Sequence, residues 1–133
     1  MFIDASAIIA VLADEREADG IATKIETAKS ALSVSPVVIL EAVANLARIK
    51  GIGVEEAHKH LEAFLGDLGV DTVAITPEIG NAAVAAFAAY GKGRGHKAQL
   101  NLGDCFAYAC AKSLRVPLLF VGDDFTHTDI KRA

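Results

Sequence analysis

The chain has no stretch of the roughly 18–20 consecutive apolar residues that a membrane-spanning helix needs, although 53% of its 133 residues are hydrophobic. It also has no low-complexity segment, no internal repeat and no linker-like stretch. Its start, Met1-Phe2-Ile3, resembles a strand and lacks the basic residues and cleavage site of a signal peptide. We therefore expect a single domain over residues 1–133, in the cytoplasm and with no membrane association.

Cysteine is scarce, and its arrangement excludes several kinds of site. Cys105 and Cys110 are five residues apart in a helical stretch, where they face different directions, and there is no CxxC motif. This pattern predicts buried thiols in a reducing compartment rather than a disulfide or a metal site. None of the four histidines has the spacing of a zinc site.

The chain also lacks an excess of positive charge. Its formal net charge is −4, and without the four acids discussed below the remainder would be neutral. A global positive field that attracts nucleic acid is thus excluded. A polyanionic substrate would have to be held by local Lys and Arg side chains together with a metal ion.

Short apolar segments alternate with helical ones along the chain. Ser35-Pro36 and Thr76-Pro77 each combine a favoured N-cap with a proline in the first helical turn. The alternation predicts an α/β fold with a parallel sheet of four to five strands, whose ligands lie at the carboxyl ends of the strands. We expect strands at 2–4, 31–34, 71–75 and 118–121, with a short one near 129–130, and helices at 5–13, 15–29, 36–50, 54–68, 77–90 and 102–114.

Acidic residues occur where such a sheet would gather them at one edge. Asp4 follows the first strand, Glu41 lies in a mostly apolar helix, Asp104 begins another apolar helix, and Asp123-Asp124 follow the last main strand. Converging carboxylates repel each other, and their natural counter-charge is a divalent cation. Hard oxygen ligands favour Mg²⁺ or Mn²⁺.

Each acid also has a purely structural explanation. Asp4 could cap a helix, and Asp104 could interact with the helix dipole in the first turn. Glu41 could belong to a solvated stripe with Asn45 and Arg48, and Asp residues are common in turns. The combination of the acids, rather than any one of them, indicates a site.

The glycine-rich loop at residues 91–99 carries Lys92, Arg94 and Lys97. These side chains and Arg48 are candidates for phosphate contacts, and a solvated connection is the alternative. The loop lacks the GxxxxGK[ST] pattern and follows a helix, so it matches neither a P-loop nor a Rossmann fingerprint. A receiver-type phosphoacceptor domain is disfavoured as well, because Asp71 begins a middle strand instead of ending one.

The chain as a whole resembles the PIN-domain ribonucleases, and specifically the VapC-type toxins of toxin–antitoxin pairs. The resemblance spans the chain in order and spacing and is most specific at NLGDCFAYACAK. It also rests on Glu41 and on the segments Ile3-Asp4-Ala5-Ser6-Ala7, Gly122-Asp123-Asp124-Phe125 and Thr128-Asp129-Ile130. It departs from many relatives at Val121, where they carry Lys.

The resemblance implies a Rossmann-like PIN fold and Mg²⁺- or Mn²⁺-dependent endonuclease action on RNA, with a homodimer and a cognate antitoxin as partners. Its last motif places an acid directly before the Phe, which favours Asp124 and leaves Asp123 open. We expect Asp4, Glu41, Asp104 and Asp124 to hold one or two metal ions that activate a water, with Ser6 and Asn45 supporting them by hydrogen bonds. The alternative is a catalytically silent module that binds a nucleotide or a partner.

Overall fold

Four short parallel strands form the centre of the computed structural model, which describes all 133 residues. The strands are β1 (Phe2–Ile3), β2 (Ser33–Val34), β3 (Asp71–Thr72) and β4 (Leu118–Leu119), in the order β3-β2-β1-β4. Phe2 pairs with Ser33 on one side and Leu118 on the other. The predicted α/β fold with a parallel sheet is confirmed, at the lower end of the expected number of strands.

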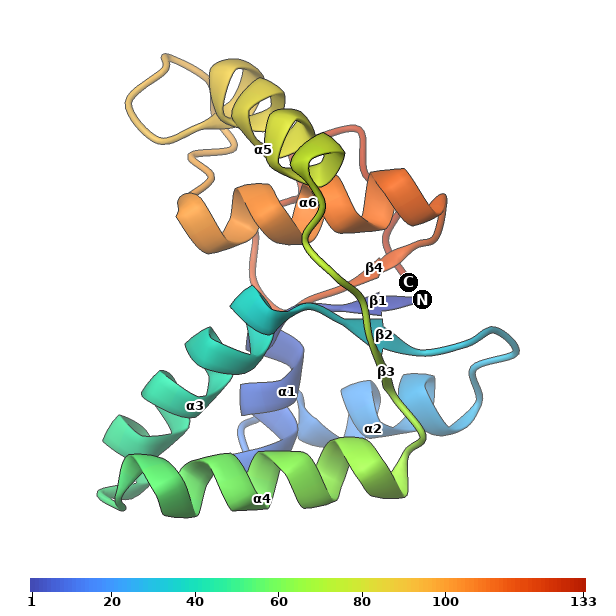
Figure 1. Ribbon diagram of the computed structural model, residues 1–133, viewed down its shortest axis with the longest axis vertical. Helices are drawn as coiled ribbons and strands as arrows, with labels where there is room; N and C mark the ends of the chain where they lie inside the picture. Colours follow the sequence, from blue (N-terminus) through green and yellow to red (C-terminus); the bar gives the residue numbers. More distant parts are fainter.

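Helices cover both faces of this sheet (Figure 1). On one side lie α1 to α4, and on the other lie α5 and α6. The bounds of the helices are α1 Ala5–Leu12, α2 Ala18–Glu26, α3 Pro36–Lys50, α4 Val54–Asp67, α5 Pro77–Tyr90 and α6 Leu102–Leu114. Both chain ends lie near each other, at the edge of the sheet away from the starts of α3 and α6.

The expected strand near residues 129–130 does not form, and this prediction was wrong. The Ile130 N–H is bonded to Thr128 Oγ1 at 3.3 Å, so the chain turns there and cannot pair. The tail instead makes one isolated bridge further on, between Leu118 and Arg132. The second helix is also shorter than expected, since it runs from Ala18 to Glu26 and is preceded by a turn in which the Ala18 N–H donates to Glu15 O at 2.9 Å.

The two predicted cap-and-proline starts are confirmed. Ser35 Oγ accepts the Val38 N–H at 3.3 Å at the start of α3, and Thr76 Oγ1 accepts the Ile79 N–H at 3.2 Å at the start of α5. Since Ser35 follows β2 directly, α3 leaves the carboxyl end of that strand. This connection places the first turns of α3 beside the edge where β1 and β4 also end.

The core is apolar and closely filled. Phe2, Ile3 and Leu118 have no exposed surface, as expected for strands covered on both faces. Cys105 and Cys110 are buried free thiols, in agreement with the sequence-based expectation. None of the helices is both long enough and apolar enough to cross a membrane.

The same substitution should have very different effects at two leucines. Leu61 on α4 is fully buried, whereas Leu40 on α3 is 70% exposed. We expect Leu61→Ala to lower the free energy of unfolding by about 2–5 kcal/mol, through lost burial and a residual cavity. Leu40→Ala should change it by less than about 0.5 kcal/mol. Urea denaturation of both variants measures the difference, and equal losses would contradict this assignment of the core.

Candidate active site

Asp4 is held at the junction of β1 and α1 by both its backbone and its side chain. Its N–H donates to Leu119 O at 2.9 Å, which continues the pairing of β1 with β4. Its carboxylate caps α1 and accepts the Ser6 N–H at 3.0 Å. The residue is only 4% exposed, and this burial raises the pKa of the carboxyl group, with a further contribution from the charge of Asp124.

Ser6 connects this acid to the neighbouring strand. Its hydroxyl donates to Asp4 Oδ2 at 2.5 Å and accepts the Val121 N–H at 3.0 Å. Val121 lies just beyond β4, at the start of the segment that carries Asp123 and Asp124. One hydroxyl group thus ties the first acid of the site to the backbone that leads to the last one.

Glu41 reaches the start of α6 because residue 103 has no side chain. A Cβ atom on Gly103 would lie 2.2 Å from Glu41 Oε2, which is far inside any normal contact. The half-buried carboxylate therefore lies against the backbone of the first turn of α6. Burial raises the pKa of Glu41, and the charge of Asp4 raises it further.

Asp104 is fixed by a reciprocal capping box at the start of α6. Its N–H donates to Asn101 Oδ1 at 2.8 Å, and its own Oδ2 accepts the Asn101 N–H at 3.0 Å. Burial is the main cause that raises the pKa of Asp104 to about 7, and the hydrogen bond from Asn101 opposes this shift. The charges of Asp4, Asp124 and Glu41 raise the pKa as well.

Asp123 and Asp124, the two acids after β4, differ in their effect on the other carboxylates. Both Asp123 and Asp124 are exposed, but it is the charge of Asp124 that raises the pKa of Asp4 and of Asp104. Phe125, which follows, is buried and packs against Phe120 with 5.0 Å between the ring centroids. This anchor holds Asp124 beside the other acids, within electrostatic range.

The structure therefore brings Asp4, Glu41, Asp104 and Asp124 into one acidic site, from four separate parts of the chain. Their oxygen-only donor set and mutual repulsion suit a hard divalent cation such as Mg²⁺ or Mn²⁺. In the present side-chain arrangement no three of them converge closely enough to hold a metal ion.

Two supporting residues proposed from the sequence are placed differently. Ser6 donates to a carboxylate of the site, as described above. The Asn45 amide instead donates to the main-chain carbonyl of Glu41 at 2.9 Å, and its oxygen accepts from Arg48 at 3.2 Å. The spacing of these three residues indicated a shared helix face but not which oxygen the amide contacts.

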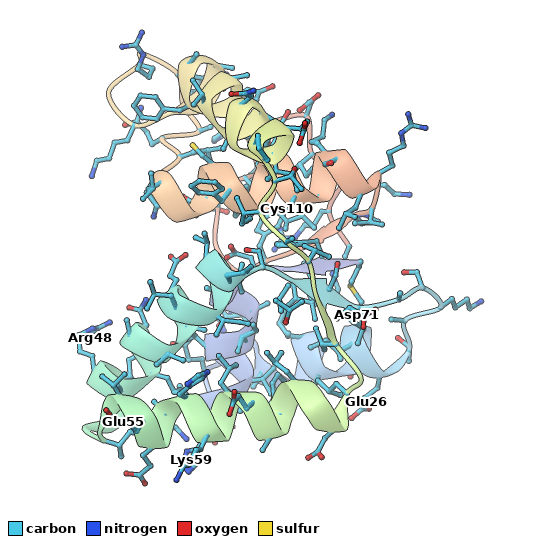
Figure 2. The ribbon with its side chains drawn as sticks, viewed as in Figure 1. Glu26, Arg48, Glu55, Lys59, Asp71 and Cys110 are labelled. Atoms are coloured by element: carbon cyan, nitrogen blue, oxygen red, sulfur yellow. The ribbon has the colours of Figure 1, made fainter.

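The candidate phosphate-binding residues lie around the site rather than in it. Lys92, Arg94 and Lys97 are exposed on the loop between α5 and α6, beyond the start of α6 (Figure 1). Arg48 lies toward the end of α3 at the edge of the molecule (Figure 2). None of these cations forms an ion pair with a carboxylate of the acidic site.

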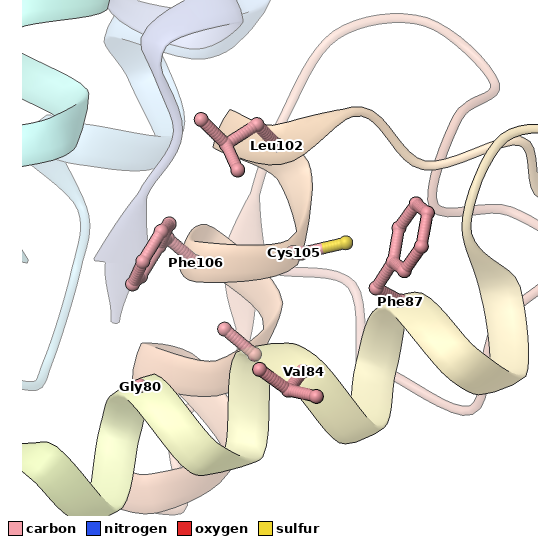
Figure 3. A pocket seen from close by; sticks show the side chains of 7 residues that line it. Gly80, Val84, Phe87, Leu102, Cys105 and Phe106 are labelled. Carbon is pink, nitrogen blue, oxygen red and sulfur yellow. The ribbon is translucent and has the colours of Figure 1, made fainter.

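An apolar hollow lies on the side of α6 that faces α5 (Figure 3). It has a volume of about 300 Å³ and no acid lines it. Cys105 Sγ points toward Phe87 inside it, and Leu102 and Phe106 lie along α6. Val84 and Leu102 are 69% and 77% exposed, so this apolar surface is open to solvent and distinct from the acidic site.

Gly103 is the site residue that the sequence reasoning missed. The sequence did contain a sign of this role. Glycine is unfavourable in a helix, yet Gly103 stands in the first turn of an apolar helix, directly before Asp104. The reason for it is a contact with Glu41, more than sixty positions away, which spacing alone cannot show.

Comparison with known proteins identifies the family to which the chain belongs. The family model of the PIN domain matches residues 1–131. A VapC ribonuclease of Rhizobium meliloti is 39% identical over 97% of this chain and 98% of its own length. Ribonuclease VapC30 of Mycobacterium tuberculosis is 41% identical over 98% of this chain and 95% of its own. The chain therefore belongs to the PIN domain family and, within it, to the VapC ribonucleases.

Solved structures agree on the fold. The crystal structure of Mycobacterium tuberculosis VapC20, described as a toxin that cleaves the sarcin–ricin loop, superimposes with a TM-score of 0.80 at 16% identity. The alignment covers 99% of this chain and 97% of that one. A toxin–antitoxin complex from Klebsiella pneumoniae gives a TM-score of 0.71 at 18% identity, over 96% of this chain and 92% of the other.

Two glycine substitutions should distinguish an effect on metal affinity from an effect on the stability of the fold. We expect Gly103→Ala to displace the Glu41 carboxylate and to weaken Mn²⁺ binding by about tenfold. Gly80, inside α5, has no atom within 4 Å of an added Cβ. Gly80→Ala should therefore keep Mn²⁺ affinity and raise the free energy of unfolding by about 0.5–1 kcal/mol. Calorimetric titration with Mn²⁺ measures the affinities, and equal values in both variants would exclude Glu41 from the site.

Asp104 should make the metal-free protein less stable as the pH rises. Its pKa of about 7 in the folded state exceeds its unfolded value, so the folded state binds more protons between these values, and stability falls as pH increases through this range. In Asp104→Asn the amide oxygen can still accept the Asn101 N–H. We expect this variant to raise the melting temperature by several degrees at about pH 8 and by much less at about pH 4.

Thermal melts in EDTA provide the measurement. Asp123→Asn, an identical change at an exposed neighbour of the site, is the control and should not reproduce this pH-dependent gain. A gain of the same size at both pH values would show that the charge of Asp104 is not the cause.

Proposed function

We propose that this protein is a metal-dependent endoribonuclease and acts as the toxin of a toxin–antitoxin pair. The observation that carries the proposal is the acidic site of Asp4, Glu41, Asp104 and Asp124 at the carboxyl edge of a PIN-domain sheet. Identity of about two fifths over nearly the full length with VapC ribonucleases supports it.

The four acids would hold one or two Mg²⁺ or Mn²⁺ ions. When bound, such an ion lowers the pKa of a coordinated water and stabilises the negative charge that develops on the phosphodiester. Burial and then the charges of the other acids raise the pKa of Asp104, and a bound divalent cation would offset both effects, which supports this assignment.

The residues of this chain would then divide the remaining tasks. The Ser6 hydroxyl fixes the orientation of Asp4, and the capping box fixes Asp104. As the alternative to metal binding, Glu41 would act as the general base that removes a proton from the attacking water, a role that its half-buried position and raised pKa suit. Attack by water leaves a 5′-phosphate and a 3′-hydroxyl and needs no 2′-hydroxyl nucleophile.

The RNA backbone would be held by the cations around the acidic site. Arg48, Lys92, Arg94 and Lys97 are exposed and lie on the elements that flank it. Contacts of this kind position a phosphate backbone without reading its sequence. The overall charge of −4 means that such attraction is local to these side chains.

We further propose two protein partners, a cognate antitoxin and a second copy of the chain. Apolar side chains on the surface support a protein partner, since Val84, Phe87 and Leu102 are 45% to 77% exposed around one hollow. The structural likeness to a chain of a toxin–antitoxin complex is consistent with this proposal.

Cleavage of total cellular RNA by the purified protein tests the proposal. We expect discrete fragments with 5′-phosphate ends in Mg²⁺, none in EDTA, and a loss of at least about 100-fold in Asp4→Asn and in Asp124→Asn. The matched control is Asp123→Asn, which changes the adjacent acid and should retain most of the activity. Fragment ends are identified by their susceptibility to a 5′-phosphate-dependent exonuclease.

Comparison of Asp123→Asn with Asp124→Asn also shows which of the two acids after β4 belongs to the site. A loss in Asp123→Asn with activity retained in Asp124→Asn would reassign the fourth acid. Equal cleavage by wild type and Asp4→Asn would trace the activity to a contaminant. A folded, Mn²⁺-binding protein that cuts no RNA would favour the alternative of a silent partner-binding module.

A further inference from the structure

A group of aromatic and charged side chains lies outside the acidic site, along α6. Asp129, in the C-terminal tail, accepts hydrogen bonds from the hydroxyl of Tyr108 and from Lys112 Nζ, the latter at 2.9 Å. These two bonds lower the pKa of Asp129, so its carboxylate is ionised. Tyr90, the last residue of α5, lies 3.5 Å from the same carboxylate through its hydroxyl oxygen.

Tyr90 links this group to the loop that carries the candidate RNA contacts. Its ring lies edge-on to Tyr108 with 5.6 Å between centroids, and edge-on to His96 with 4.9 Å between centroids. His96 is in the middle of the basic loop, which comprises residues 91–99. A continuous series of contacts therefore runs from Asp129 through Tyr108 and Tyr90 to His96.

The backbone of the loop is fastened at the same residue. Leu100 N–H donates to Tyr90 O at 2.9 Å, and Lys92 N–H donates to Leu100 O at 2.8 Å, which closes the base of the loop. Inside the loop, His96 Nδ1 accepts the Ala98 N–H at 3.0 Å. The His96 ring is thus held by its own loop on one side and by Tyr90 on the other.

The same contacts leave the cations of the loop free. Lys92, Arg94 and Lys97 are exposed and belong to neither of the two side-chain ion pairs of the protein. Gly93 and Gly95 adopt φ values of 80° and 79°, so they shape the turn but contribute no side chain that could hold it. Within the loop the Gln99 amide donates to His96 O at 2.5 Å, and the edge-on contact of His96 with Tyr90 is the aromatic contact that joins the loop to the end of α5.

We propose that Tyr90 is a positioning residue for RNA binding. It is held in place by Asp129 and Tyr108, and its ring supports His96 and thereby fixes the basic loop beside the acidic site. Tyr90 touches neither the metal-binding acids nor the reacting phosphate. The RNA-binding half of this inference rests on the proposed ribonuclease function, whereas the positioning of the loop does not.

Limited trypsin digestion tests the positioning directly, because the loop contains three trypsin sites. In Tyr90→Leu we expect cleavage after Lys92, Arg94 and Lys97 to accelerate about twofold to tenfold, the range expected when one aromatic contact is lost and cleavage follows local opening. Tyr108→Phe, which removes the hydroxyl bonded to Asp129, should accelerate it less. Cleavage after Lys59, within α4, serves as the internal reference for global unfolding.

Arg132→Gln is the matched control for a simple loss of tail anchoring. Arg132 stacks on Phe120 and donates to Phe120 O at 3.4 Å, so it fastens the tail without touching Tyr108 or Tyr90. We expect this variant to leave cleavage of the loop at the wild-type rate. Acceleration in Arg132→Gln equal to that in Tyr90→Leu would assign the effect to the tail and overturn the proposal.

RNA affinity supplies the second readout. In an Asp4→Asn background, which keeps the RNA intact, Tyr90→Leu should weaken binding of a fluorescein-labelled unstructured RNA by about twofold to tenfold. With active protein the same change should raise KM and leave kcat nearly unaltered.

The outcomes separate the two hypotheses. Unchanged trypsin cleavage in Tyr90→Leu would overturn the positioning role, and faster cleavage with unchanged RNA affinity would overturn the role in RNA binding. If the Asp4→Asn protein with Tyr90 intact binds no RNA at all, the proposed function fails, while the digestion still decides how the loop is held.

Discussion

Repulsion among four carboxylates at one edge of the sheet is the constraint on which the arrangement of the site depends. Their side chains come from the end of β1, the middle of α3, the first turn of α6 and the turn after β4. Burial and neighbouring charge both raise the pKa of the first three. Such a group favours protons or cations over the empty, fully ionised state.

The backbone prevents the acids from separating to relieve this repulsion. Asp4 is held by the ladder between β1 and β4, and Asp104 is held by its capping box with Asn101. Glu41 lies where only a glycine at position 103 leaves room. Moving Asp4 or Asp104 would break hydrogen bonds that hold the starts of α1 and α6, so a bound proton or cation is the remaining way to relieve the repulsion at these two acids.

The parts of the structure that obey local rules could be predicted from the sequence. Ser35 and Thr76 begin helices because a hydroxyl cap and a following proline act within one turn. The acids could be assigned to one edge because Asp4 and Asp124 follow strands of a parallel sheet. The resemblance to the PIN domain favoured Asp124 and left Asp123 open, and in the structure the charge of Asp124 raises the pKa of Asp4 and of Asp104.

Features that depend on distant contacts could not be predicted in the same way. A short strand was expected near Asp129, but the Asp129 carboxylate accepts a hydrogen bond from Lys112 of α6, and the chain turns at Ile130. Asn45 had the spacing of a residue beside the site, yet its amide contacts a main-chain carbonyl. The role of Gly103 depends on where α3 crosses α6. For the tail and for Gly103 the partner lies beyond the range of a periodic pattern, whereas for Asn45 the spacing indicates the shared helix face but not which oxygen the amide contacts.

The order of strands has a consequence for how the protein is made. β1 pairs with β4, the last strand to be synthesised, and the Asp4 N–H is bonded to Leu119 O across that junction. Asp124 follows β4 and lies 120 residues after Asp4 in the chain. A nascent chain that has not yet reached these residues has three of the four acids at most and an unpaired first strand. The acidic site therefore forms only after Asp124 has been synthesised, and a nascent chain that ends before this residue carries no complete site.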